Sequence, residues 1–280
     1  MNYRHAFHAG NFADVHKHVV LLALLERLGR KPKPLFYLDT HAGRGWYDLR
    51  SPDATRGNEW QEGIARIAGH AAVSEDLRRY LATVSAPHGA DATPTRYPGS
   101  PILAMRQLRD GDRIVLVEQQ IAEAQALEHS THGRRGVSVV CGDGYAALKT
   151  YLPPRENRGL VLIDPPYESE NELTNAGRAL HFGRGRWPNG MFALWYPIKA
   201  GREAQRLHAS LRESGLRKLL QVEVYVRPPD SPLGLNGSGM IILNPPWQFD
   251  LEIAPALDEI SRALGIDGAG AARVDWLVGE

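Results

Sequence analysis

The sequence predicts an α/β protein built on a doubly wound, mostly parallel sheet with helices on both faces. Short apolar runs typical of buried strands alternate with helical patterns along most of the 280 residues. Several of these runs end in an acidic residue, at the edge where open α/β sheets bind ligands. The last two predicted strands have no long helix between them, so we expect them to pair as an antiparallel hairpin.

The composition is that of an ordinary globular chain. Hydrophobic residues make up 43% and charged residues 23% of the sequence, which argues against intrinsic disorder. The net charge of +1 provides no global attraction for a polyanion, so any nucleic-acid contact must come from a local patch. A single cysteine, Cys141, excludes an internal disulfide. With no secretory or membrane-spanning segment in the sequence, a cytoplasmic location is expected.

The first fifty residues predict a helix, a strand and a glycine-rich loop. Asn11 can cap a helix over residues 12–28, whose apolar positions recur at helical spacing. The KPKP stretch breaks this helix, and residues 35–38 then form a strand that delivers Asp39 into the loop DTHAGRG. Such a strand, acid and glycine-rich turn indicate the first unit of a nucleotide-binding fold.

An insertion delays the second strand of this unit. Residues 51–96 carry two helical patterns, 58–67 and 74–84, where a simple nucleotide-binding unit would already have reached its next strand. We interpret them as a small helical insertion subdomain, with residues 1–50 and 97–280 forming the main domain.

Strands and helices then alternate again. Ser100 is expected to cap the helix in GSPILAMRQLR, with Pro101 at its first helical position. The remaining expected elements are strand 113–117 ending in Glu118, helix 121–129, strand 137–140, helix 145–152, strand 160–163, strand 191–196, helix 201–214, strand 219–226 and strand 239–243. Residues 266–273 are expected to form a turn or a loose loop.

Acids at strand ends point to a nucleoside site. Glu118 stands where an acid after the second strand accepts hydrogen bonds from a ribose, and Asp143 lies in the following GDG loop. The loop HAGRGW lacks the third glycine of the dinucleotide fingerprint, which disfavours NAD. A nucleoside without phosphates fits better.

The motif DPPY, which begins at Asp164, suits methyl transfer to an amino group. The lone pair of adenine N6 is delocalised into the ring, so an enzyme must hold the amine in line with the methyl group. The Asp164 carboxylate and the Pro165 carbonyl can each accept an N6 hydrogen bond, while Tyr167 can stack on the base. Asp164 can also take the proton, and no covalent intermediate is needed. Taken alone, DPPY could equally be a rigid turn, which is how we interpret NPPW at 244–247.

Six stretches carry a family resemblance: YRHAFHAGNFADVHKH, LDTHAG, YPGSP, LVLIDPPYE, ALWYP and SGMIILNPPW. Along essentially the whole chain they are similar to motifs of the bacterial 23S rRNA adenine-N6 methyltransferase J family. The resemblance implies a Rossmann-like enzyme that uses S-adenosylmethionine to methylate adenine N6 in 23S rRNA, at position 2030 of the reference rRNA. The target base would be flipped out of its helix. We expect a monomer whose partner is 23S rRNA and that makes no membrane contact.

The resemblance also implies roles for individual residues. By similarity, the S-adenosylmethionine site would be lined by Lys17, His18, His41, Ser100, Glu118, Asp143, Gly144 and Asp164. Glu118 would hold the ribose, and Asp143 would lie near the adenine of the cofactor. Asp164, Pro165 and Tyr167 would be catalytic, and Tyr3 and His5 would contact the RNA.

A metal site is not expected. Four histidines lie near the amino terminus, but His16 and His18 are two residues apart on a helix and face different ways, whereas chelation there requires a separation of four. For Trp46 packing is the favoured interpretation.

The residues alone leave other functions open. A DNA adenine methyltransferase would use the same chemistry, and guanine N2 or a glutamine amide are other acceptors of related motifs, although Asp at position 164 favours adenine. An RNA-binding protein with an inactive nucleotide site is a further alternative, disfavoured by the joint presence of Glu118, Asp143 and DPPY. The best candidate patch for RNA is the loop GRGRWPNG, where Arg184 and Arg186 flank Trp187.

Overall fold

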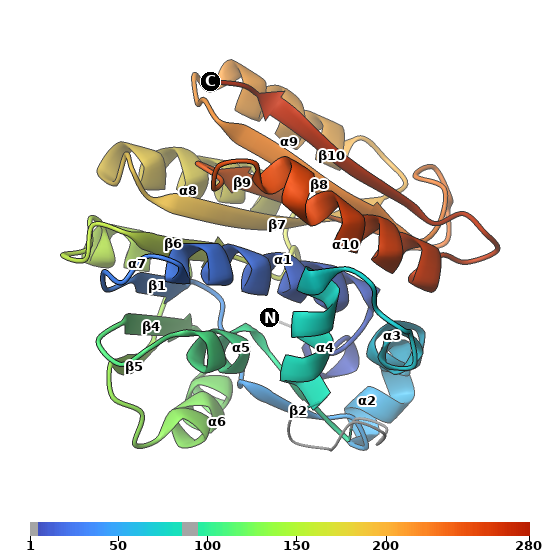
Figure 1. The fold of residues 1–280 in the computed structure, drawn as a ribbon, viewed down its shortest axis with the longest axis horizontal. Helices are drawn as coiled ribbons and strands as arrows, with labels where there is room; N and C mark the ends of the chain where they lie inside the picture. The colour runs from blue at the N-terminus through green and yellow to red at the C-terminus, as the bar shows by residue number, and fades with distance from the viewer. Residues whose placement is uncertain (1–4, 86–94) are drawn as a thin grey trace.

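The computed structural model describes residues 5–85 and 95–280. Its centre is an eight-stranded sheet of order β10-β8-β9-β7-β6-β1-β4-β5 (Figure 1). The parallel part contains β1 (Phe36–Asp39), β4 (Arg113–Glu118), β5 (Val137–Cys141), β6 (Gly159–Ile163) and β7 (Met191–Lys199). The antiparallel part contains β8 (Leu219–Tyr225), β9 (Leu235–Leu243) and β10 (Ala271–Val278). The predicted α/β class and the late β8–β9 hairpin are confirmed.

Helices cover both faces of the sheet and enclose two cores. On one face lie α1 (Phe12–Gly29), α5 (Ser100–Gln107), α6 (Ile121–Thr131) and α10 (Phe249–Leu264). On the other lie α7 (Gly144–Tyr151), α8 (Glu172–Arg186) and α9 (Glu203–Glu213). Every residue of β6 is buried between the two layers, which explains its uninterrupted apolar sequence.

Helix α1 is buried on all sides. It begins as predicted at Asn11, whose side chain accepts a hydrogen bond from the Asp14 amide at 2.9 Å. Every residue from Ala13 to Leu25 is buried, because the sheet covers one side of the helix and α4, α5 and α10 cover the others. The polar side chains near its start are therefore buried too, and each of their charges needs a partner.

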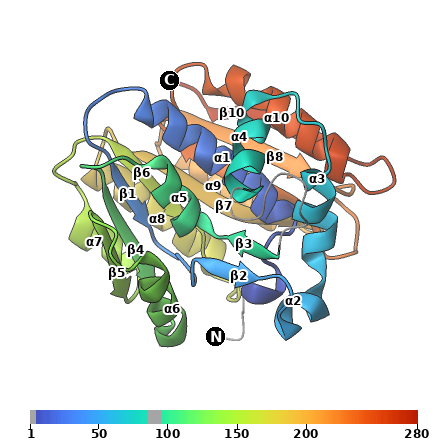
Figure 2. The same ribbon diagram turned by 60° about the horizontal axis from the view of Figure 1, so that its bottom comes forward.

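Residues 51–96 contain more structure than predicted. They contain α2 (Pro52–Gly57), the π-helix η2 (Gln61–Ala65), α3 (Arg66–Ala68) and α4 (Glu75–Ser85). Two short elements precede this region in the chain: the 3-10 helix η1 (His5–Phe7) and strand β2 (Trp46–Asp48). Strand β3 (Arg96–Pro98) then returns to pair with β2 beside α2 and η1 (Figure 2). Side chains such as Ile64, Leu77 and Tyr80 join the core beneath α1. Division of the chain into a main domain and an insertion subdomain stays a prediction.

Two expectations about local structure are wrong. Gly99, and not Ser100, is the cap of α5; Ser100 is its first helical residue, and its hydroxyl donates instead to the buried Asp39 carboxylate at 2.6 Å. The segment GRGRWPNG is not an exposed loop, because Arg184 and Arg186 belong to α8 and Trp187 is only 4% exposed. Gly183 allows this packing, since a Cβ there would lie 2.4 Å from the Phe192 ring.

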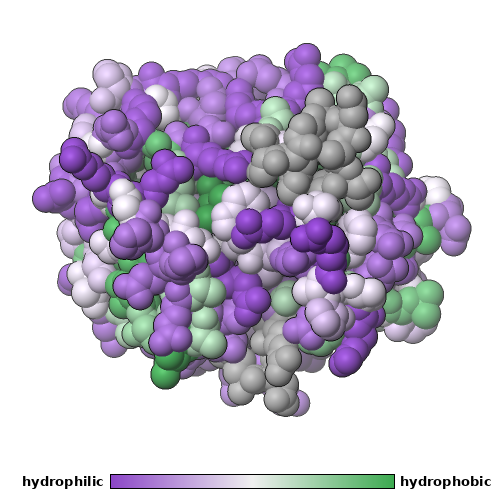
Figure 3. Space-filling model, turned by 90° about the horizontal axis from the view of Figure 1, so that it is seen from below, coloured by the Kyte–Doolittle hydropathy of each residue, from purple (hydrophilic) through white to green (hydrophobic). Residues whose placement is uncertain are grey.

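Several later elements were not predicted. Helices α8 and α10 and strand β10 were missed, and β10 begins at Ala271, inside the stretch expected to be a loop. Within residues 5–85 and 95–280, no helix is both long and apolar enough to cross a bilayer. Seen from below, the surface is mostly hydrophilic, with apolar side chains in small groups (Figure 3).

The buried carboxylate of Glu259, in α10, anchors the segment before α4. Its Oε1 accepts hydrogen bonds from the Val73 amide (2.7 Å) and from His70 (3.0 Å). Its Oε2 accepts from the amide (3.0 Å) and the hydroxyl (2.6 Å) of Ser74. One side chain thus fixes the start of α4 against α10.

We predict that Glu259→Ala lowers the free energy of unfolding by about 2–3 kcal/mol, because it leaves the donors of residues 70–74 without their charged acceptor. Amide exchange across α4 should become faster. Asp258→Ala, at an exposed position on the same helix turn, is the matched control and should change neither. Denaturant unfolding and hydrogen exchange measure both effects; equal exchange in the two variants would contradict this anchoring role.

Candidate active site

The carboxyl ends of four neighbouring strands open into one cavity of 890 Å³. In sheet order, these are β4 with Glu118, β1 followed by His41 and Gly43, β6 followed by Asp164, and β7 with Trp195. At about 4.8 Å between strands, this row is about 14 Å wide. Such a cavity can hold a nucleoside-sized ligand with a second group beside it.

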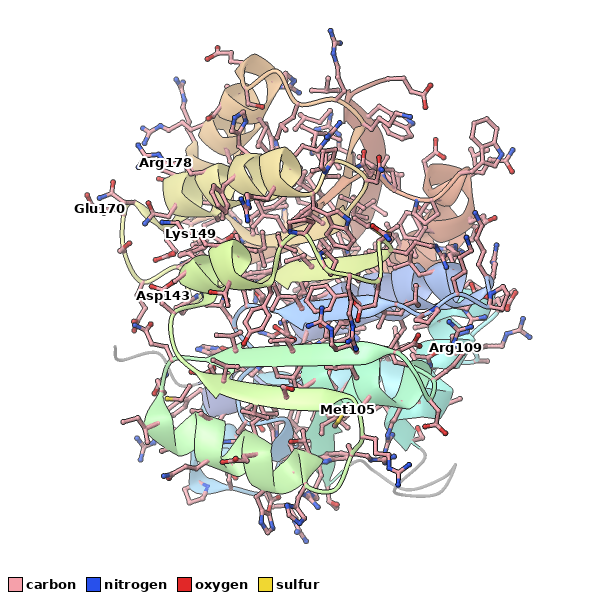
Figure 4. All side chains as sticks on the ribbon, turned by 90° about the vertical axis from the view of Figure 1, so that its left-hand side faces the viewer. Met105, Arg109, Asp143, Lys149, Glu170 and Arg178 are labelled. Atoms are coloured by element: carbon pink, nitrogen blue, oxygen red, sulfur yellow. The ribbon has the colours of Figure 1, made fainter. Side chains whose placement is uncertain are left out.

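The structure brings most of the predicted site residues together. The cavity is lined by His5, Lys17, His18, His41, Ser100, Glu118, Asp164, Pro165 and Tyr167. Asp143 is not part of this lining: it is exposed and caps α7, accepting from the Ala146 amide at 2.8 Å. Asp143 nevertheless lies at the same edge of the sheet as Glu170, opposite Arg109 (Figure 4). Tyr3 lies outside the described residues.

A buried ion triad joins α1 to β6. The Lys17 ammonium lies 2.9 Å from Oδ1 of Asp14 and 2.5 Å from Oδ2 of Asp164. Burial opposes the charge on Lys17, but the two carboxylates outweigh it and hold the pKa of Lys17 well above its ordinary value. Lys17 therefore stays cationic and holds one oxygen of Asp164. No hydrogen bond from the described residues occupies the other oxygen, Oδ1.

Asp14 is held from its other side by the amino-terminal segment. Its Oδ2 accepts from the Gly10 amide at 2.9 Å and lies 3.1 Å from Nε2 of His5. Burial alone would raise the pKa of Asp14, but Lys17 and His5 hold it well below its usual range. The residues before α1 are thereby tied to the triad.

Glu118 forms a fixed acceptor at the other end of the cavity. Its Oε2 accepts from the Gly43 amide at 2.9 Å, and its Oε1 accepts from the Gln120 amide at 2.7 Å. Gly43 has φ +63°, and a Cβ there would lie 2.2 Å from the Tyr47 hydroxyl oxygen, so the loop needs glycine. A carboxylate offers about four acceptor positions, so two remain for ligand hydroxyls.

The floor between these ends is polar but buried. Asp39 accepts from Ser100 at 2.6 Å and from the Tyr37 hydroxyl at 3.0 Å, and burial raises the pKa of Asp39 to about 6. His18 bonds the Tyr97 hydroxyl at 2.7 Å, and burial lowers the pKa of His18 to about 3. Asp39 thus positions Ser100 from beneath the cavity.

Known proteins resemble the chain along its whole length. Residues 32–278 match the family described as ribosomal RNA large subunit methyltransferase D, RlmJ. The chain belongs to this family. It is 37% identical over 280 residues to the ribosomal RNA large subunit methyltransferase J of Haemophilus influenzae, and 39% identical over 281 residues to that of Escherichia coli, with 100% of each chain covered. A crystal structure of a Legionella pneumophila protein superimposes with a TM-score of 0.88 at 34% identity, covering 96% of this chain and 98% of that one.

Trp195 is the main site residue of this RlmJ-family chain that sequence reasoning missed. Its carbonyl accepts the hydroxyl of Tyr167, the two rings are 5.5 Å apart, and its own ring lies 5.7 Å from the Lys17 ammonium. Tyr167 has φ +53°, a strained conformation for a tyrosine that this contact helps to maintain. Trp195 stood within the quoted stretch ALWYP, but an apolar strand gives no sign of which of its residues faces a cavity.

The indole of Trp195 is held in place by Ser238, which also contacts His16. Its indole Nε1 donates to the Ser238 hydroxyl at 2.9 Å, and Nδ1 of His16 lies 2.8 Å from the same oxygen. Burial first, and Lys17 second, lower the pKa of His16 to about 3. The folded protein therefore keeps His16 neutral at pH values where an unfolded chain protonates it.

This difference predicts a pH-dependent effect of His16→Gln. Because the folded pKa is depressed, the contribution of His16 to stability is complete above pH 6.5 and is lost as the pH falls toward 3. The destabilisation caused by the substitution should be greatest at pH 7.5. Below pH 6.5 it should shrink by about 1.4 kcal/mol per pH unit. Denaturant unfolding of both proteins at pH 7.5, 6 and 5 measures it, and a difference independent of pH would be the contrary result.

Proposed function

We propose that this protein transfers a methyl group from S-adenosylmethionine to N6 of an adenine in 23S rRNA. The observation that carries the proposal is the placement of Asp164. Its carboxylate stands in the cavity between a ribose-type acceptor, Glu118, and an aromatic pair, Tyr167 and Trp195, with Oδ2 held by Lys17. Membership of the RlmJ family supports both the cofactor and the substrate.

The residues around Glu118 fit the cofactor. The two remaining acceptor positions of the Glu118 carboxylate suit the two hydroxyls of a ribose. We assign the rest of this end to Lys17, His18, His41 and Ser100, with Asp143 and Gly144 at the neighbouring strand end. Gly144 lets the start of α7 approach the residue that follows β1, since a Cβ there would lie 2.0 Å from the Thr40 carbonyl oxygen. When bound, S-adenosylmethionine supplies an electrophilic methyl group on a sulfonium.

The residues on the far side of Asp164 suit an adenine. Oδ1 of Asp164 and the Pro165 carbonyl would accept the two N6 hydrogens, which orients the nitrogen and favours a tetrahedral geometry. Tyr167, whose hydroxyl is fixed on the Trp195 carbonyl, would present its ring to the base. Because these groups lie inside a cavity, the base must leave its helix to reach them.

The ion triad indicates which residue accepts the proton that leaves N6. Lys17 is not the base, because its pKa is held well above the ordinary value and it stays protonated. Its role is to hold the Asp164 carboxylate in place through Oδ2. Asp164 then takes the N6 proton through Oδ1 as positive charge develops on the nitrogen. Among the described residues, no cluster of three or more His, Cys, Asp or Glu could hold a metal ion.

The amino-terminal segment would contact the RNA. His5 lies at the cavity and is tied to Asp14, so its place depends on the same triad. We assign RNA contact to His5 and to Tyr3, two residues before it. We further propose that the protein acts as a monomer and, because its proposed substrate is rRNA, that it acts in the cytoplasm.

We predict that Asp164→Ala reduces methyl transfer to unmodified 23S rRNA at least 100-fold, because it removes both the N6 acceptor and the proton acceptor. Labelled S-adenosylmethionine and nucleoside analysis for N6-methyladenosine measure it. The control is Glu170→Ala, which removes an exposed acid six residues later and should keep full activity.

Duplex DNA, assayed in parallel, tests the choice of nucleic acid. Label in DNA alone would keep the chemistry and overturn the substrate. Failure of the wild-type protein to bind S-adenosylmethionine in calorimetry would contradict the enzymatic proposal and favour an RNA-binding protein.

A further inference from the structure

One exposed apolar side chain lies beside the acceptor end of the cavity. Leu233 is 71% exposed, in the connection between β8 and β9, and the next two residues, Gly234 and Leu235, line the cavity. A leucine in this position gains nothing for the core. Exposed apolar residues beside a binding site are candidates for contact with the ligand.

The loop that carries Leu233 is stiff. The Asn236 side chain is buried and donates to the carbonyls of Pro229 at 3.2 Å and Ser231 at 2.6 Å. The Arg227 guanidinium donates to the Leu235 carbonyl at 3.3 Å, and Pro228, Pro229 and Pro232 restrict the backbone further. These contacts constrain the backbone on both sides of Leu233, and its side chain is exposed.

The strand order places this loop on the side of the target base. Leu235 pairs with Lys199 of β7, and Lys199, Pro197 and Trp195 line the cavity from alternate positions of that strand. Glu118, at the end of β4, lies three strands beyond β7. Another exposed apolar residue near the cavity, Ile121, begins α6 on the Glu118 side and so is not near the acceptor.

We propose that Leu233 is a wedge, a side chain that enters the RNA base stack where the target adenine leaves it. The inference rests on the proposed function, because it requires a flipped base. Extruding a base breaks its stacking contacts, and this loss opposes flipping. An apolar side chain inserted between the bases left behind offsets part of this loss. A rigid loop suits this role, since the stacked bases would displace a leucine on a mobile loop.

The test uses two 23S rRNA transcripts that differ in one base. In one transcript the target adenine is opposite uridine; in the other it faces adenine, so the pair is already broken. We expect Leu233→Ala to lower kcat/KM at least tenfold on the first transcript and less than twofold on the second. Leu251→Ala is the matched control: Leu251 is 67% exposed, on α10, and the variant should match the wild type on both transcripts.

A second readout follows the base directly. With 2-aminopurine at the target position, the wild-type protein should raise the fluorescence on binding, and Leu233→Ala should not. Equal losses of kcat/KM on the two transcripts, or no loss on either, would overturn the wedge while leaving the methyltransferase intact. Absence of methylation of both transcripts by the wild type would instead overturn the proposed function, and the wedge with it.

Discussion

The buried contact of Lys17 with Asp14 and Asp164 is the interaction on which the site depends. Helix α1 is covered on all sides, so a charge near its start cannot be solvated and must be paired within the protein. The lysine bridges a carboxylate of its own helix and one that follows β6, 147 residues later. It thereby fixes α1 against the end of β6, and through Asp14 it also fixes the segment that carries His5.

The strand order converts this local contact into an ordered site. Glu118 ends β4, Asp164 follows β6 and Trp195 lies in β7. The proposed cofactor side and the proposed acceptor side therefore lie on opposite flanks of the Asp164 carboxylate. The change from parallel to antiparallel pairing after β7 matters too. It brings the β8–β9 connection, with its stiff proline-rich loop, to the same edge as DPPY, while NPPW, at the end of β9, lies at the opposite edge.

The sequence predicts the parts of this fold that depend on local patterns alone. The Asn11 cap, the apolar run of β6 and the acid at the end of β4 each carry their own signal, and all were predicted. The stretch that contains Gly183 and Trp187 was wrongly predicted to be a loop, because Gly183 allows close packing and does not form a turn. Ser100 was wrongly predicted to cap α5, because its hydroxyl donates a hydrogen bond to Asp39, which is distant in the sequence. No spacing rule could pair Lys17 with Asp164, or show that Trp195 faces the cavity, because both depend on tertiary packing.

The most direct test of this account is a double-mutant cycle of Lys17→Met and Asp164→Asn in single-turnover methyl transfer, with thermal unfolding followed in parallel. If Lys17 acts by holding the carboxylate, the double variant should be no slower than Asp164→Asn alone, which means a strong coupling between the two sites. Losses that simply multiply, in variants that remain folded, would show that the two residues act independently and would contradict the central role of the ion triad.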